Sequence, residues 1–134
     1  MQSKLINNRM KARQILAFDG LQWGRCRPTD LDFSMDWQQR TYIFCEVKTE
    51  GSPLTIGQRI HLEGLVDAIR AGGRVAYAIV ACHRTPDSFE DVLVAECRTD
   101  KVYGGIKWDI VDTQETLSAT IDSMFEEHKR GKGK

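Results

Sequence analysis

Polar and apolar residues alternate strictly over residues 29–36, which read Thr-Asp-Leu-Asp-Phe-Ser-Met-Asp. A period of two is typical of a β-strand with one apolar face. The leucine, phenylalanine and methionine of this run share that face, whereas Asp30 and Asp32 share the opposite one. The pattern therefore predicts a strand that presents two neighbouring carboxylates on its polar side.

The remaining elements follow from the same periodicities and from turn residues. They are a helix over 7–18, a turn at 38–40, a strand over 41–49, a helix over 54–71 that ends at Gly72-Gly73, a strand over 74–82, a strand over 92–95, an edge hairpin over 101–108 and a helix over 113–129. The run at 74–82 is apolar almost throughout, as expected of a strand covered on both faces. A hairpin followed by a helix and a buried strand predicts an α/β fold, with a mixed central sheet flanked by helices.

Composition limits the classes of protein that this sequence can represent. The chain has 134 residues, with 19 Lys and Arg against 19 Asp and Glu, so its net charge is zero and gives no support to nucleic-acid binding. We expect one domain over 1–134, with a basic tail at about 128–134. No apolar run approaches the roughly 18 residues of a membrane helix, and the first residues lack a secretory apolar segment. The expectation is a cytoplasmic protein whose widely spaced cysteines are free thiols.

The second strand of the predicted hairpin carries two charges in apolar surroundings. Glu46 and Lys48 lie two residues apart and share a face of the run Ile-Phe-Cys-Glu-Val-Lys. Burying such charges is costly unless they are paired or hold a metal. Carboxylates that converge from neighbouring strands repel each other, and a hard cation such as Mg²⁺ relieves that repulsion. The alternative is an exposed cross-strand salt bridge on a solvated hairpin, which is the commoner meaning of Glu-x-Lys alone.

A glutamine extends the apolar stripe of the predicted 54–71 helix by one turn. Gln58 precedes Leu62 by four residues, so both lie on the same helix face. A glutamine in that position either points into the site of Glu46 and Lys48 or forms a hydrogen bond to loop backbone. The sequence leaves both alternatives open.

The residues described above resemble a known family. Pro28-Thr29-Asp30, Glu46-Val47-Lys48 and Gly57-Gln58 look like the motifs of the PD-(D/E)XK nuclease superfamily, in particular its small stand-alone members from phages and prophages. The motif-bearing resemblance covers about residues 7–70. It implies a restriction-endonuclease-like core, that is, a mixed four-stranded sheet flanked by helices.

The resemblance also implies roles for individual residues. Asp30 and Glu46 would bind the metal, with help from the backbone carbonyl of Val47, and Lys48 would support the attacking water. Gln58 corresponds to a glutamine that recurs in one large subgroup. Asp32 lies on the same face as Asp30 and is the alternative ligand, whereas the first predicted helix offers no acid as a further ligand. Arg9 and Arg13, one turn apart in that helix, are candidates for phosphate contacts.

The leading hypothesis is therefore a Mg²⁺-dependent nuclease that hydrolyses phosphodiester bonds in DNA, with Mn²⁺ as a substitute metal. The neutral charge and small size suggest a homodimer, because one small domain offers little surface for a duplex. The main alternative is a catalytically inactive nucleic-acid-binding or phage-assembly module with the same fold. The sequence does not distinguish an endonuclease from an exonuclease.

Overall fold

A five-stranded mixed β-sheet organises the computed structural model, which describes residues 16–84 and 91–132. Its elements, in chain order, are β1 (Phe33–Trp37), β2 (Thr41–Thr49), α2 (Ile56–Ala71), β3 (Val75–His83), the 3-10 helix η1 (Val94–Glu96), β4 (Arg98–Tyr103), β5 (Trp108–Ile110) and α3 (Leu117–Lys132). The spatial order of the strands is the same as their order in the chain. The predicted α/β class with a mixed sheet is confirmed.

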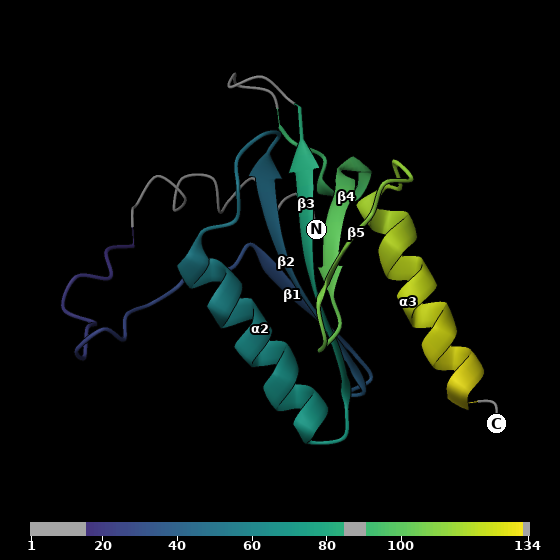
Figure 1. Cartoon of the computed structure of the whole chain (residues 1–134), viewed down its shortest axis with the longest axis horizontal. Helices are drawn as coiled ribbons and strands as arrows, with labels where there is room; N and C mark the ends of the chain where they lie inside the picture. The colour runs from purple at the N-terminus through teal and green to yellow at the C-terminus, as the bar shows by residue number, and fades with distance from the viewer. Residues whose placement is uncertain (1–15, 85–90, 133–134) are drawn as a thin grey trace, which may run out of the picture.

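Strands β2 and β3 form the parallel pair at the centre of the sheet, and the other neighbouring strands pair antiparallel. A parallel pair needs a crossover connection, and α2 supplies it. Figure 1 shows α2 and α3 on the two sides of the sheet, with the strands between them. The expectation of helices on both faces is therefore also correct.

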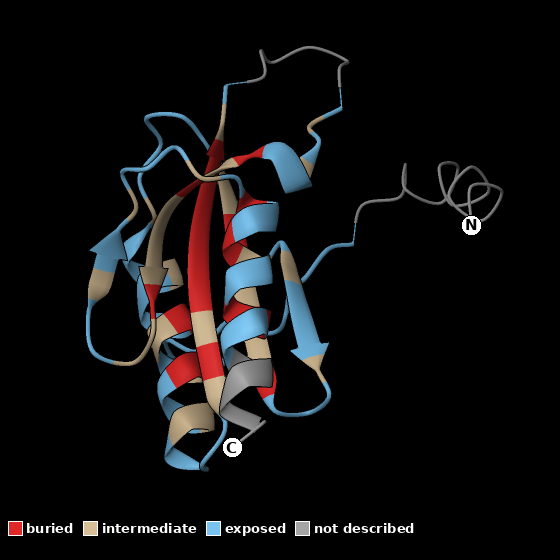
Figure 2. Cartoon of the chain, turned by 90° about the vertical axis from the view of Figure 1, so that its right-hand side faces the viewer, coloured by how far each residue is buried: buried red, intermediate tan, exposed pale blue. Residues whose placement is uncertain are grey.

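Alternation along the central strands divides the core between the two faces. Ile43 and Cys45 of β2 belong to a buried cluster with residues of α3, whereas Phe44 packs into a second cluster with Leu62 and Val66 of α2. Figure 2 shows the buried residues concentrated in the central strands and on the inner sides of the helices. Because side chains alternate between the faces, Glu46 and Lys48 fall on the face that carries α2.

The hairpin that joins β1 to β2 fixes how these strands pair. Its turn contains Gln38 and Gln39 at φ values of 54° and 57°, and the backbone N–H of Gln39 donates to Asp36 Oδ1 at 2.6 Å. Positive φ at two successive turn residues suits the right-handed twist of a hairpin. The resulting register pairs Phe33 with Cys45 and Trp37 with Thr41.

Several predicted boundaries differ from the structure. Residues 16–18 are not helical, and the rest of the helix predicted over 7–18 lies outside the described residues. The first strand begins at Phe33 rather than residue 29, and the strand predicted over 92–95 is wrong because η1 occupies 94–96. The last helix begins at Leu117 and continues through Lys132, so it takes in most of the residues predicted as a basic tail.

Candidate metal centre

Glu46 is a charged residue placed in the interior of the fold. It lies on the α2 face of β2, opposite Val80 of β3, and only 6% of its surface is exposed. Strand β2 forms because its β-branched and aromatic residues pack on both faces of a central strand. A buried carboxylate is costly unless other groups stabilise it, so its neighbours determine what this position does.

Asp32 is the acid that the hairpin brings to Glu46. The register that pairs Phe33 with Cys45 puts Asp32, one residue before β1, opposite Glu46. A hydrogen bond fixes the Asp32 side chain next to Glu46, because the backbone N–H of Val47 donates to Asp32 Oδ2 at 2.7 Å. The two carboxylates therefore lie close together on neighbouring strands, although the acid preferred from the sequence was Asp30 rather than Asp32.

The electrostatics of Glu46 reflect this arrangement. Burial raises the pKa of Glu46 above its ordinary value, and the nearby charge of Asp32 raises the pKa further. The charge of Lys48 lowers the pKa and opposes both effects. Burial and a like charge both favour the protonated form of a carboxyl, so a cation placed between the two acids would favour its ionised form.

Gln58 donates from its Nε2 to Glu46 Oε1 at 3.2 Å. Its other amide atom is fixed by the N-terminus of α2, where Gln58 Oε1 accepts from the backbone N–H of Thr55 at 3.2 Å. In return, Thr55 Oγ1 accepts from Gln58 N–H at 3.1 Å, which completes a capping box. Gln58 therefore does what both alternatives expected, because its amide oxygen bonds to the loop backbone and its amide nitrogen bonds to the buried acid.

Lys48 is half-buried on the same face as Glu46. It borders a cavity of about 240 Å³ that lies between the end of β2 and the neighbouring strands. The alternative of a solvated hairpin predicted that Glu46 and Lys48 would both be fully exposed, with no cleft above them. The burial of Glu46 and the cavity beside Lys48 contradict that alternative.

The other predicted site residues lie elsewhere. Asp30 is exposed, precedes β1 by three residues, and forms no hydrogen bond or ion pair with any residue that the structure describes. Asp32 is thus the acid beside Glu46, and Asp30 is not brought to it by any described contact. Arg9 and Arg13 fall in a part of the chain that is not described, so their predicted phosphate contacts remain predictions.

The donor set can be tested against the requirements of Mg²⁺. Within residues 16–84 and 91–132, no group of three or more His, Cys, Asp and Glu side chains is arranged to hold a metal. Mg²⁺ commonly uses only one or two carboxylates and completes its octahedron with water and substrate phosphate. Asp32 and Glu46 supply that pair of carboxylates, and the Val47 carbonyl is one more oxygen donor on the same strand. The residues therefore fit Mg²⁺ as a weakly bound, water-rich ion and do not fit a closed structural site.

Two residues near this centre were missed by the sequence analysis. Thr55 orients Gln58, and the Thr-x-x-Gln spacing of a capping box was a signal that could have identified it. Arg98 of β4 borders the same cavity as Lys48, but it comes from a strand fifty residues later in the chain. Only the sheet register reveals that proximity, because nothing local to Arg98 indicates it.

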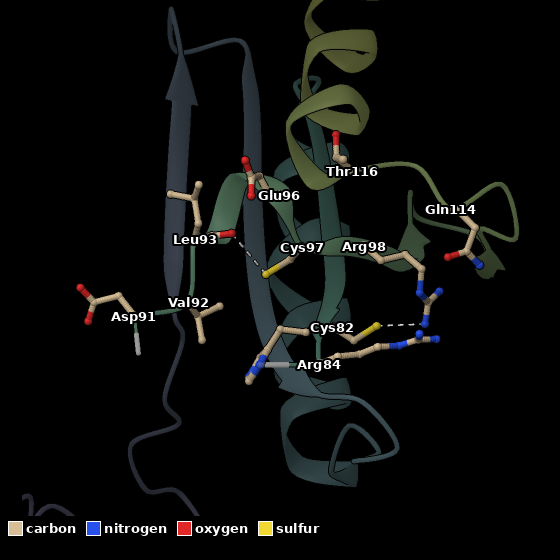
Figure 3. A pocket seen from close by; sticks show the side chains of 11 residues that line it. Cys82, Arg84, Asp91, Val92, Leu93, Glu96, Cys97, Arg98, Gln114 and Thr116 are labelled. Atoms are coloured by element: carbon tan, nitrogen blue, oxygen red, sulfur yellow. Dashed lines mark hydrogen bonds between the residues drawn. The ribbon is translucent and has the colours of Figure 1, made fainter. Parts of the chain in front are cut away.

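A larger cavity of about 520 Å³ is also lined by Arg98 (Figure 3). Cys82, Arg84 and Arg98 gather on one side of it, and Asp91 lies on the other. Cys82 and Cys97, which also lines this cavity, are buried free thiols. Cys45 is likewise a buried free thiol, whereas Cys26 is exposed, so the prediction of buried free thiols holds for three of the four cysteines.

Comparisons with known proteins give no relative for this chain: no family model, curated protein or solved structure matches it. Among the described residues, no helix is long and apolar enough to cross a membrane.

Proposed function

We propose that this protein is a Mg²⁺-dependent nuclease of the PD-(D/E)XK type that hydrolyses phosphodiester bonds in DNA. The observation that carries the proposal is the acid pair formed by the buried Glu46 and the exposed Asp32, which lies beside Lys48 on one face of the sheet. A carboxyl whose pKa is raised by burial and by a neighbouring like charge is characteristic of functional sites. The restriction-endonuclease-like core is part of the same proposal.

Each residue of the centre has a distinct task in the proposed reaction. Asp32, Glu46 and the Val47 carbonyl would hold Mg²⁺, which supplies charge stabilisation for the phosphate and the leaving oxygen. Lys48 would orient the attacking water and stabilise negative charge that develops in the transition state. Gln58 donates to Glu46 Oε1 and so fixes the orientation of the Glu46 carboxylate beside Asp32.

The ion pairs of the molecule favour catalysis over the inactive-module alternative. A non-catalytic relative is expected to neutralise its vestigial acid with a basic neighbour. Glu46 forms no ion pair within the described part of the chain, and its hydrogen-bond donor is the neutral amide of Gln58. Lys48 lowers the pKa of Glu46 but forms no ion pair with it, so an external cation can still bind between the two acids.

Cleavage assays on matched acid variants test this proposal. Supercoiled, linear and branched DNA are incubated with Mg²⁺ or Mn²⁺ and wild type, Glu46→Gln, Asp32→Asn or Asp30→Asn. Asp122→Asn on the exposed side of α3 is the control, because Asp122 lies on the opposite side of the sheet. We expect metal-dependent cleavage that is lost in Glu46→Gln and Asp32→Asn and retained in the other two variants.

Each outcome separates the possibilities. Cleavage lost in Asp30→Asn but retained in Asp32→Asn would assign the metal ligand to Asp30. Metal binding without cleavage by any variant would favour the inactive nucleic-acid-binding or assembly module. The absence of both metal binding and cleavage in wild type would refute the nuclease proposal.

A further inference from the structure

Three side chains form a row across the α2 face of the sheet, next to the acid pair. Lys48 of β2 pairs in register with Cys82 of β3, which pairs in turn with Arg98 of β4. Neighbouring strands lie about 4.8 Å apart, so the Cα atoms of Lys48 and Arg98 are separated by about 10 Å. Long cationic side chains from these two positions can reach one small group placed between them.

A cavity occupies the space above this row. Its volume is about 240 Å³, and both Lys48 and Arg98 line it, together with Thr49 and the Gly51-Ser52-Pro53 turn. A water molecule takes up about 30 Å³ in the liquid, so the cavity accommodates a hydrated anion of phosphate size. Asp100 is the one acid among its described lining residues, so the ionised groups there carry a net positive charge.

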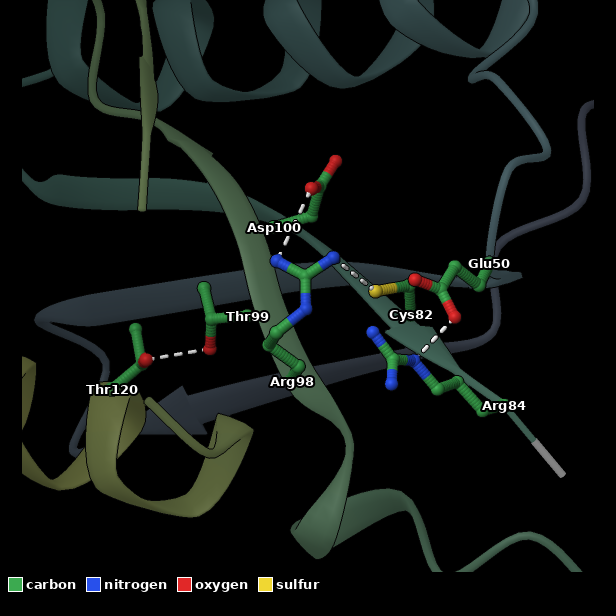
Figure 4. A network of polar contacts seen from close by, with 7 residues as sticks. All are labelled: Glu50, Cys82, Arg84, Arg98, Thr99, Asp100 and Thr120. Carbon is green, nitrogen blue, oxygen red and sulfur yellow. Dashed lines mark hydrogen bonds and ion pairs between the residues drawn. The ribbon is translucent and has the colours of Figure 1, made fainter. Parts of the chain in front are cut away.

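The guanidinium of Arg98 is held in place before any ligand arrives. Its Nη2 donates to Cys82 Sγ at 2.9 Å, and its Nη1 lies 3.6 Å from Asp100 Oδ1 (Figure 4). The separation from Asp100 is long for a charge-assisted hydrogen bond, which is normally below 2.9 Å. Asp100 therefore occupies the position of a weak internal anion that a stronger external anion can replace.

We infer that this cavity binds a backbone phosphate of the DNA substrate, adjacent to the phosphate that is cleaved, with Arg98 as its main ligand. The inference rests on the proposed function, because it places the phosphate beside the acid pair. Arginine presents several donors in a plane and matches phosphate oxygens in pairs. Lys48 forms the wall of the cavity nearest to Glu46, so the subsite and the metal centre are contiguous along β2.

The first experiment measures the salt dependence of DNA binding for a matched set of variants. Binding of labelled duplex DNA is followed by fluorescence anisotropy in Ca²⁺, at a series of NaCl concentrations. Each phosphate contact contributes about 0.9 to the slope of log affinity against log salt. We expect Arg98→Gln to weaken binding about tenfold and reduce the slope by about 0.9, and Arg98→Lys to retain the slope.

A variant that should strengthen DNA binding and a pair of control variants complete this test. Asp100→Asn removes the competing anion, so it should tighten binding. Lys107 and Asp109 form a similar ion pair, 3.8 Å apart, with side chains that are 77% and 68% exposed and away from the cavity. Lys107→Gln and Asp109→Asn should therefore leave both affinity and slope close to wild type.

A second experiment separates failure of the subsite from failure of the nuclease proposal. Inorganic phosphate is titrated into the metal-free protein, and the Nε–H resonance of Arg98 is followed by ¹H–¹⁵N NMR. A phosphate-dependent shift that is stronger in Asp100→Asn supports the subsite, even if no DNA is cleaved. Cleavage by wild type together with an unmoved Arg98 resonance and an unchanged slope in Arg98→Gln would overturn the subsite and leave the nuclease standing.

Discussion

Gln58→Met removes the amide that links the helix cap to the buried acid while it keeps the length of the side chain. Three hydrogen bonds are lost, one to Glu46 Oε1 and two that Gln58 Oε1 accepts from the backbone N–H and the hydroxyl of Thr55. The first is the costly loss, because Glu46 is buried and a hydrogen bond to a charged group contributes about 1.5–3 kcal/mol. Thr55 is exposed, so its N–H and hydroxyl can both turn to water, and the loss of their common acceptor adds only about 0.5 kcal/mol.

The expected cost depends on pH. Where Glu46 is ionised, the variant should lose about 2–3 kcal/mol of its free energy of unfolding. Where Glu46 is protonated, the lost bond is one between neutral groups, and the cost should fall to about 1 kcal/mol. Urea unfolding of wild type and variant, at one pH below and one above the raised pKa of Glu46, measures the difference.

Two comparisons test the reasoning behind these values. Arg59→Met alters the neighbouring exposed position of α2, and its effect on stability should be small and independent of pH. In a Glu46→Gln background, the cost of Gln58→Met should shrink, since residues in direct contact couple. An equal cost at both pH values, or full additivity with Glu46→Gln, would refute the claim that Gln58 acts through the Glu46 carboxylate.

Two further predictions concern stability. The folded state raises the pKa of Glu46, so the native protein binds this proton more tightly than the unfolded chain does. Stability is therefore lost as pH rises from the pKa of Glu46 in the unfolded chain to its pKa in the folded protein. Glu46→Gln should therefore be more stable than wild type at neutral pH when a chelator removes free metal. Added Mg²⁺ should stabilise wild type but not the variant. Thermal unfolding of both proteins across a range of pH measures these differences. Thr99 and Thr120 share a buried hydrogen bond of 2.6 Å, but Thr120 also bonds to Glu115 Oε2. Thr120→Val should thus cost about 1–3 kcal/mol by leaving Thr99 unpaired, and Thr99→Val should cost less; equal costs in urea unfolding would contradict this.

Much of the fold was predictable where the local signals agree. Strand β2 was predicted over its full length, 41–49, because a run of β-forming residues stands between a turn and Gly51-Ser52-Pro53. The end of α2 followed from Gly72-Gly73 in the same way. In each case, the turn residues that flank the element and the apolar residues that pack it against the core predict the same boundary.

The run at 92–95 shows where such signals fail. Val-Leu-Val-Ala is too short for its period to be measured, so β-propensity favoured a strand. In the structure, β4 occupies the edge of β3 that such a strand would need, and the chain forms η1 instead. The outcome depends on which segment pairs with β3, and local sequence does not contain that information.

The site was predictable in its types of residue and less so in their register. Asp30 and Asp32 share one face in any strand, so alternation alone cannot choose between them. The hairpin turn determines which aspartate lies beside Glu46. It pairs Trp37 with Thr41, and the same register places Asp32 opposite Glu46. Arg98 was beyond reach for the same kind of reason, because its position beside Lys48 depends on pairing between strands that are distant in sequence.

The irregularity in β4 has a consequence for how such a gene can vary. Arg98, Thr99 and Lys101 pair with three consecutive residues of β3, so Asp100 is the additional residue of a β-bulge. Deletion of the Asp100 codon would restore a regular ladder and leave Arg98 on the same face. One in-frame deletion would thus remove the internal anion while the cation keeps its place. The length of β4, as well as its composition, is therefore a heritable means of adjusting how strongly this cavity attracts negative charge.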